Sequence, residues 1–233
     1  GFPVVATSSS GCAAVLGYAD GQQIPRGEMV FLIARIVQSV KVPVTADVEA
    51  GYDDAEQTAL DIIATGAVGL NFEDMIGDVL LPIETQVQRL RVLRSVAEVN
   101  GVPLVINART DIYLANYGDA ATRFERSVER LNAYREAGAD CLFVPGVRDA
   151  ETIGRLVQAI NGPVNILAMP GSPSIPEMKT LGVARVSLGG GPSRVALGAV
   201  RRLARTLRDE GTFDGLSGEA IPSQELQDLI ARR

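Results

Sequence analysis

Acidic side chains directly follow two apolar runs of the sequence. Asp47 and Glu49 come after the run at residues 42–46, and Glu73 comes after the run at 68–72. Residues two apart in an extended strand project to the same side, so Asp47 and Glu49 should face together, with Glu73 meeting them from the next strand. Converging carboxylates repel one another unless a cation binds between them or a proton is held. Oxygen ligands suit Mg²⁺, with Mn²⁺ as the alternative, so the pattern predicts a site for a hard metal ion.

Helix capping is the competing interpretation of acidic residues that follow strands. Asp53 and Asp54 fit it, because both precede a helical pattern, and Asp74 could act in the same way. Asp47 and Glu49 do not fit it, because they lie within the end of the strand itself.

Arg109 follows another apolar run, at residues 104–106. Its guanidinium could hold a carboxylate or a phosphate through two parallel hydrogen bonds. The alternative is an internal ion pair with Asp111 or Glu73. The serines at 8–10 offer hydroxyl and backbone N–H groups to an anion, although a simple serine turn explains the same residues.

Composition excludes several classes of site. The chain of 233 residues has no histidine, which rules out Ser-His-Asp and Cys-His catalysis and histidine-ligated zinc. A net charge of −6 gives no general attraction to nucleic acid or to an anionic membrane. No apolar run approaches the ~20 residues that span a bilayer. Two cysteines, Cys12 and Cys141, make no disulfide framework, so we expect a cytoplasmic protein.

Seven short apolar runs alternate with amphipathic stretches along the chain. The runs are almost continuous in Val, Ile, Leu and Ala, which is typical of parallel strands buried on both faces. Between them, apolar residues recur at helical spacing, as at Val30, Ile33 and Val37. The runs begin near Val4, Val42, Val68, Val102, Cys141, Val164 and Arg185.

The runs also repeat in pairs. Pro43, Pro103 and Pro163 precede three of them at intervals of 60 residues, which is two strand–helix units. Such repeats form either a doubly wound sheet or a closed (β/α)₈ TIM barrel. No glycine-rich nucleotide-binding loop follows a run, which favours the barrel. A closed barrel of this kind needs eight strands, and the sequence has seven runs. We therefore expect the first βα unit to be missing from this chain. The barrel domain is predicted at residues 1–211, with a C-terminal tail and helix at 212–233.

Several segments together resemble the isocitrate lyase/phosphoenolpyruvate mutase superfamily. The order and spacing of the motifs agree over nearly the whole chain. They are SSSG (8–11), LGYAD (16–20), TADVEAGY (45–52), NFED (71–74) and NARTD (107–111). Members are (β/α)₈ barrels that bind Mg²⁺ and a 2-oxo acid or a related small carboxylate, and they usually form dimers of dimers that exchange the last helix.

The resemblance implies a role for each matching residue. Asp47 would contact Mg²⁺ most directly, and Glu49 and Glu73 would support it through water. Asp20 would lie near the reacting atoms. The substrate would be held by Ser8, Ser9, Ser10, Asn107 and Arg109.

The loop after NFED departs from the superfamily pattern. Lyases of the superfamily carry a Lys-x-Cys-Gly-His loop there, and the mutases keep a Lys and an Asn, whereas residues 75–82 read MIGDVLLP. The departure argues against isocitrate cleavage and weakens the case for phosphoryl mutase chemistry. We therefore expect Mg²⁺-dependent cleavage of a C–C bond in a small 2-oxo or 2-hydroxy acid, by a decarboxylase or lyase reaction. Tyr52 or a water would donate the proton, and Asp20 could act as a base.

Two other functions stay open at this point. One is C–P chemistry of the phosphoenolpyruvate mutase or phosphonopyruvate hydrolase type, and the other is binding of an oxo acid without catalysis. The tail predicts a short amphipathic helix after Ser223, with Leu226, Leu229 and Ile230 on it. It could pack on its own barrel, but the resemblance favours packing on a neighbouring subunit, so we expect a homodimer or homotetramer.

Overall fold

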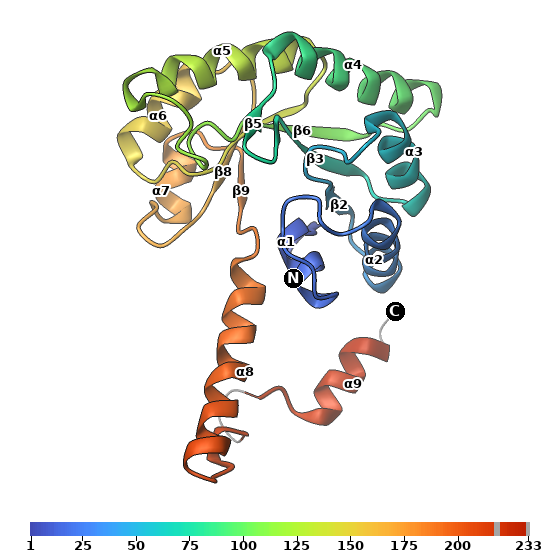
Figure 1. The fold of residues 1–233 in the computed structure, drawn as a ribbon, viewed down its shortest axis with the longest axis vertical. Coiled ribbons are helices and arrows are strands. Elements are labelled where there is room, and N and C mark those ends of the chain that lie inside the picture. The colour runs from blue at the N-terminus through green and yellow to red at the C-terminus, as the bar shows by residue number, and fades with distance from the viewer. Residues whose placement is uncertain (217–219, 232–233) are drawn as a thin grey trace.

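A parallel sheet of seven strands forms the body of the protein in a computed structural model, which describes residues 1–216 and 220–231 (Figure 1). Every predicted strand is present, and each pairs in parallel with its neighbours in the order β1-β2-β3-β6-β7-β8-β9. The strands are β1 (Val5–Ala6), β2 (Val44–Asp47), β3 (Gly69–Glu73), β6 (Val105–Arg109), β7 (Cys141–Val144), β8 (Val164–Leu167) and β9 (Arg185–Ser187).

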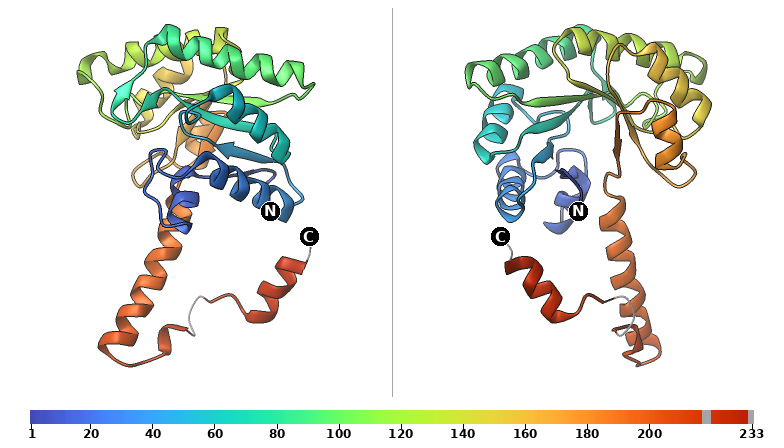
Figure 2. Two further views of the ribbon diagram at one scale, coloured as in Figure 1. Left: turned by 45° about the vertical axis from the view of Figure 1, so that its right-hand side comes forward. Right: turned by 180° about the vertical axis from the view of Figure 1, so that it is seen from behind.

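The helices between residues 26 and 180 follow one another around the outside of the curled sheet, while the helix at residues 9–15 lies on its open side near the N-terminus (Figures 1 and 2). This arrangement confirms the predicted α/β class and the barrel-like curvature. Within the described residues the sheet is a half-barrel with β1 and β9 at its edges; the eighth strand stays a prediction. The helices of the body are α1 (Ser9–Val15), α2 (Arg26–Ser39), α3 (Ala55–Thr65), α4 (Ile83–Val99), α5 (Arg123–Glu136), α6 (Ala150–Ala159) and α7 (Ile175–Thr180).

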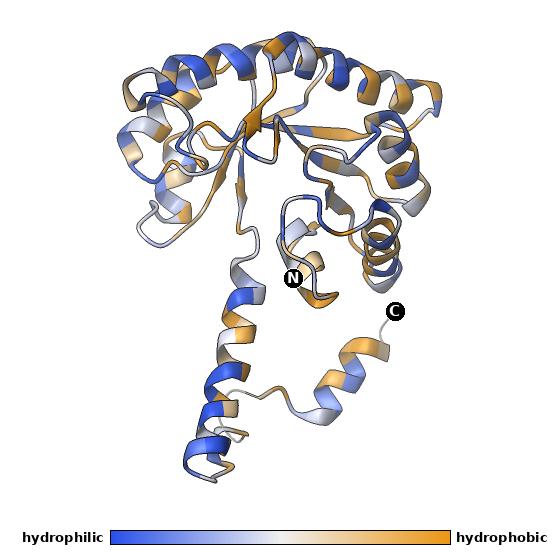
Figure 3. Cartoon of the chain, in the orientation of Figure 1, coloured by the Kyte–Doolittle hydropathy of each residue, from blue (hydrophilic) through white to orange (hydrophobic). Residues whose placement is uncertain are grey.

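The apolar core lies between the sheet and these helices. Leu70, Phe72 and Ile106 are fully buried there, and burying each such side chain stabilises the fold by about 1.5–3 kcal/mol. Because successive residues of a strand point to opposite faces, the same packing turns Asn71 and Glu73 toward the inside of the curl. The apolar positions therefore decide where the polar side chains go, and Figure 3 shows the strands as apolar segments among more polar helix surfaces.

Asp54 caps helix α3 as the sequence predicts. Its side chain accepts a hydrogen bond from Gln57 N at 3.0 Å, and Gly66 ends the helix in the left-handed conformation that glycine adopts without strain (φ 84°). The predicted cap at Asp53 is wrong, because that carboxylate pairs with Arg26 at 2.8 Å instead.

Two strands that the sequence analysis did not predict form a hairpin after β3. They are β4 (Met75–Ile76) and β5 (Val79–Leu80), which pair in an antiparallel ladder. The turn between them contains Gly77 in a left-handed conformation (φ 56°). The segment that departs from the superfamily pattern is therefore a short, ordered hairpin beside the end of β3.

The C-terminal part of the chain extends away from the sheet. Helix α8 (Gly191–Asp209) projects outward and has no buried residue, and α9 (Ser223–Ala231) begins at Ser223 as predicted (Figure 1). The last strand ends at Ser187, and the domain boundary at 211, which falls just after α8, stays a prediction. Residues 217–219 and 232–233 of the predicted tail lie outside the described residues. Among the described helices, none is long and apolar enough to cross a membrane.

Candidate active site

Side chains, most of them polar, point into the curl of the sheet in two rows that follow the strand register. Residues paired across parallel strands share a face, so each row presents its side chains together. The first row is Asp47, Asn71, Asn107 and Cys141, on β2, β3, β6 and β7. The second row is Glu73, Arg109, Phe143, Asn165 and Arg185, on β3, β6, β7, β8 and β9.

A cavity of about 710 Å³ lies over these rows. Its lining combines most of the predicted site with the glycine-rich turn after β9. The charged and hydroxyl residues in its wall include Ser8, Ser9, Ser10, Asp20, Asp47, Glu49, Glu73, Arg109, Arg185 and Ser187.

Asp47 is held in place by the segment that follows β1. Its Oδ2 accepts a hydrogen bond from Ser9 N at 3.0 Å, and its own N–H donates to Thr7 Oγ1 at 2.8 Å. The side chain is buried, and its Oδ1 has no hydrogen-bond partner within the described residues. A buried carboxylate oxygen without a donor is costly, which makes this atom a candidate ligand.

Glu49 repeats this arrangement on the segment after β2. Its Oε2 accepts a hydrogen bond from Gln22 N at 2.6 Å, while Oε1 is buried with no partner among the residues described. Burial is the main cause that raises its pKa, to about 7. Glu49 (φ 52°) and Gln22 (φ 58°) both adopt left-handed backbone conformations, which are strained for residues with side chains.

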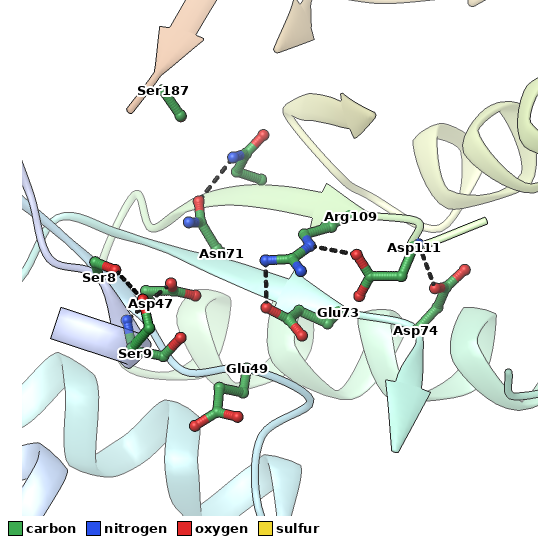
Figure 4. A network of polar contacts seen from close by, with 12 residues as sticks. Ser8, Ser9, Asp47, Glu49, Asn71, Glu73, Asp74, Arg109, Asp111 and Ser187 are labelled. Carbon is green, nitrogen blue, oxygen red and sulfur yellow. Dashed lines mark hydrogen bonds and ion pairs between the residues drawn. The ribbon is translucent and has the colours of Figure 1, made fainter. Parts of the chain in front are cut away.

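Glu73, unlike the other two carboxylates, is paired with an arginine. Its Oε1 lies 2.5 Å from an η-nitrogen of Arg109, and Arg109 Nε donates to Asp111 Oδ1 at 2.7 Å (Figure 4). Burial raises the pKa of Glu73 and the Arg109 charge opposes that shift. Within the described residues, no group of three His, Cys, Asp or Glu side chains is found that could hold a metal ion. The three-carboxylate site stays a prediction.

Arg109 thus forms both of the internal ion pairs that were the alternative to substrate binding. Burial would lower its pKa, but the facing carboxylates of Glu73 and Asp111 outweigh burial and raise it. Its guanidinium also lies over the Phe143 ring, 5.7 Å from the centroid. Arg109 still lines the cavity, so its predicted role at the site stays a prediction.

The three serines lie in the cavity wall at the start of α1. Ser8 caps that helix by accepting a hydrogen bond from Gly11 N at 3.4 Å, and its Oγ lies 3.0 Å from Ser10 Oγ. The Ser9 amide donates to Asp47, whereas Ser8 and Ser10 are only half-buried and could offer their hydroxyls to an anion. Asp20 is exposed at the rim of the same cavity.

Two predicted site residues lie outside the cavity wall. Tyr52 lines a separate hollow of about 580 Å³ together with Gln22 and Arg26. Its Oη is buried without a hydrogen-bond partner among the described residues, and burial together with the charges of Glu49 and Asp47 raises its pKa. Asn107 is fully buried beneath the cavity, and its Nδ2 donates to Asn71 Oδ1 at 2.7 Å. The predicted roles of Tyr52 as proton donor and of Asn107 as a substrate contact stay predictions.

Sequence reasoning missed the role of Asp74. Its fully buried carboxylate accepts hydrogen bonds from Arg130 Nε and Tyr134 Oη, each at 2.8 Å, and from Asp111 N at 3.0 Å. Instead of capping a helix, Asp74 ties α5 to the end of β6. The spacing of Arg130 and Tyr134, four residues apart on one helix face, was the available signal.

A family model described as phosphoenolpyruvate phosphomutase matches residues 1–208. The chain belongs to the phosphoenolpyruvate phosphomutase family. The resemblance found in the motifs is thereby confirmed.

Relatives of this phosphoenolpyruvate phosphomutase family member carry several reaction names. An oxaloacetate decarboxylase of Rhodopseudomonas palustris strain HaA2 is 29% identical, over 94% of this chain and 76% of the relative. A presumed lyase/mutase from Burkholderia cenocepacia J2315 is 34% identical, with a TM-score of 0.91 over 99% of this chain and 84% of that one. A 2,3-dimethylmalate lyase of the superfamily is 26% identical, with a TM-score of 0.85 over 100% of this chain and 83% of the other. The family and these relatives support an enzyme of the lyase or mutase type.

Proposed function

We propose that the protein cleaves a C–C bond in a small 2-oxo or 2-hydroxy carboxylic acid, with the help of a divalent metal ion. The observation that carries the proposal is the pair of buried carboxylate oxygens, Asp47 Oδ1 and Glu49 Oε1, that lack any partner in the described part of the chain. Two relatives whose names describe decarboxylase and lyase reactions support the reaction class.

The residues fit a hard cation. In each of the two carboxylates, one oxygen accepts a hydrogen bond from a backbone amide, and the other has no partner among the described residues. Both are buried, so their negative charge is poorly compensated by solvent. Asp47 and Glu49 would hold Mg²⁺ or Mn²⁺, and Glu73 would support the site through water. A cation held there would supply Lewis-acid stabilisation for negative charge that develops on a 2-oxo group.

The remaining side chains bind and orient the substrate. The hydroxyls of Ser8 and Ser10 would receive one carboxylate, close to Asp47 in the same wall. Arg109 would meet substrate oxygens with the part of its guanidinium that its two ion pairs leave unused. Asp20, exposed at the rim, is the acidic side chain placed to exchange a proton with solvent.

C–P chemistry is the second candidate, because the matching family model is that of a phosphomutase. The site offers it the same carboxylates and the same arginine. The two candidates differ in the product they form, since only the second releases or rearranges a phosphorus group.

A substrate panel tests the proposal. The protein would be incubated with 2-oxo acids, 2-hydroxy acids and phosphonopyruvate, each with Mg²⁺ and with EDTA, and followed by proton and phosphorus NMR. We expect a new 2-oxo acid, or loss of CO₂, from a carbon substrate with Mg²⁺ only. Turnover of phosphonopyruvate alone would support the C–P candidate. Binding without any product would contradict both reactions and leave an oxo-acid binder.

The assembly and location of the protein are also proposals. We propose a homodimer or homotetramer built through the projecting arm of α8 and α9, whose apolar side chains are exposed. A cytoplasmic location is supported by the two cysteines, Cys12 and Cys141, which are buried and unpaired.

A further inference from the structure

Arg185 occupies the far end of the second inward-facing row. The register continues from Arg109 to Phe143, from Phe143 to Asn165, and from Asn165 to Arg185. Arg109 and Arg185 therefore start from the same level of the sheet, three strands apart, and both line the 710 Å³ cavity. The curl of the sheet turns both residues toward the space between them.

The two arginines differ in their partners. Arg109 is neutralised by Glu73 and Asp111, at 2.5 and 2.7 Å. Arg185 makes no ion pair with any residue that the structure describes, although it is half-buried. A half-buried guanidinium keeps its charge and needs an anion or solvent to compensate it.

The residues around Arg185 leave the cation uncompensated. Asn165, its register partner, donates from Nδ2 to Ser187 Oγ at 3.0 Å, so these two neutral side chains satisfy each other. Burial lowers the pKa of Arg185, and the acidic groups of Cys141 and Asp47 oppose that shift. Because Asp47 would bind the metal ion, it would not neutralise Arg185. The guanidinium of Arg185 would therefore be available to bind a ligand.

We propose that Arg185 binds the second acidic group of the substrate and thereby selects diacids over monoacids. The inference rests on the proposed function, because it assigns the two ends of one substrate. The first carboxylate of the substrate would be bound beside Asp47, by the metal ion and the serines. The distal acid group would reach Arg185 on β9. A monoacid of the same length would leave the Arg185 charge without a partner, and a buried group left unpaired penalises the wrong ligand.

Malate and lactate make a matched pair of probes, since both are 2-hydroxy acids and only malate has a second carboxylate. Calorimetric titration with Mg²⁺ would measure both ligands on the wild-type protein, Arg185→Gln, Arg185→Lys and the exposed control Arg91→Gln. We expect malate to bind the wild type at least tenfold more tightly than lactate. Arg185→Gln should lose that preference and keep its lactate affinity within twofold, while Arg185→Lys recovers part of it.

An equal loss of malate and lactate binding in Arg185→Gln would overturn the inference, because a damaged cavity affects both ligands. An unchanged preference would overturn it as well. If Arg185→Gln does not fold, Arg185→Lys decides, through a reduced preference at unchanged lactate affinity. An Arg185-dependent preference without turnover of any acid would leave the inference standing and contradict the proposed function. Turnover of diacids at the same rate by the wild type and by Arg185→Gln would support the proposed function and contradict the inference about Arg185.

Discussion

Glu73 and Arg109 face each other directly across β3 and β6, and their charged groups are 2.5 Å apart. The pair removes Glu73 from the group of carboxylates that lack partners. The uncompensated negative charge of the cavity therefore lies on Asp47 and Glu49, and the guanidinium of Arg109 is fixed in orientation before any ligand enters. The site thus has two parts. One is the pair Asp47 and Glu49 at the end of β2, and the other is Arg109 on β6, which is held by Glu73 on β3.

Removing the arginine should destabilise the protein. Arg109→Met leaves Glu73 and Asp111 as buried carboxylates without their cation, and breaking a buried pair in this way costs about 3–5 kcal/mol. Urea unfolding of Arg109→Met beside the exposed control Arg91→Met measures the difference. An equal free energy of unfolding in the two variants would show that the Glu73–Arg109 pair carries no stability.

Without metal, stability should fall as the pH rises through about 7. Burial raises the pKa of Glu49 from its usual 4.5 to about 7, so the folded state holds this proton more tightly than the unfolded state does. The stability that this adds is complete below pH 4.5 and is lost as the pH passes 7.

Thermal unfolding in EDTA between pH 5 and pH 8 measures this effect. The melting temperature should fall by about 2–4 °C for each kcal/mol of stability lost. Glu49→Gln does not titrate, so its melting temperature should depend less on pH than that of the wild type. Identical pH profiles of the two proteins would contradict the assignment to Glu49.

Asp74 should matter for stability more than for the chemistry. Asp74→Asn leaves Arg130 without its carboxylate at a buried position, with an expected cost of about 3–5 kcal/mol. Asp78→Asn, on the exposed hairpin turn, is the matched control. Chemical denaturation of both variants measures the cost, and a loss below ~1 kcal/mol in Asp74→Asn would contradict the anchoring role.

The arm should hold two copies together. Val195, Val200 and Ile230 are 72%, 62% and 46% exposed, and apolar surfaces of this kind mark interfaces. Light scattering should give the mass of a dimer or tetramer for the wild type and a smaller mass for the double variant Val195→Asp, Val200→Asp. A monomer mass for the wild type at every concentration would refute the assembly.

The fold could be read from the sequence because its signals are local. The apolar runs that form β2, β3 and β6 are short and continuous, and the acidic motifs follow them where parallel strands end. Asp47, Glu49 and Glu73 therefore lie at one end of the sheet, as predicted. That placement depends only on strand register and alternation.

The details that the sequence did not predict depend on long-range contacts. Whether Glu73 joins Asp47 or pairs with Arg109 is decided by register between strands 36 residues apart. Tyr52 adopts a left-handed backbone conformation, which is not predictable at a residue other than glycine. Arg185 follows no recognised motif, and its importance depends on the absence of an ion pair in the described residues, which only three-dimensional structure reveals.

Turnover by Asp47→Asn at saturating Mg²⁺ is the most direct test of the metal-assisted reaction. The variant keeps an acceptor for the Ser9 amide and loses the negative charge, so the measurement isolates the carboxylate itself. The NMR assay on the substrate that the wild type cleaves would compare it with Asp78→Asn. We expect a loss of at least about 100-fold in Asp47→Asn and none in the control. Full activity of Asp47→Asn would contradict a metal site at Asp47 and Glu49.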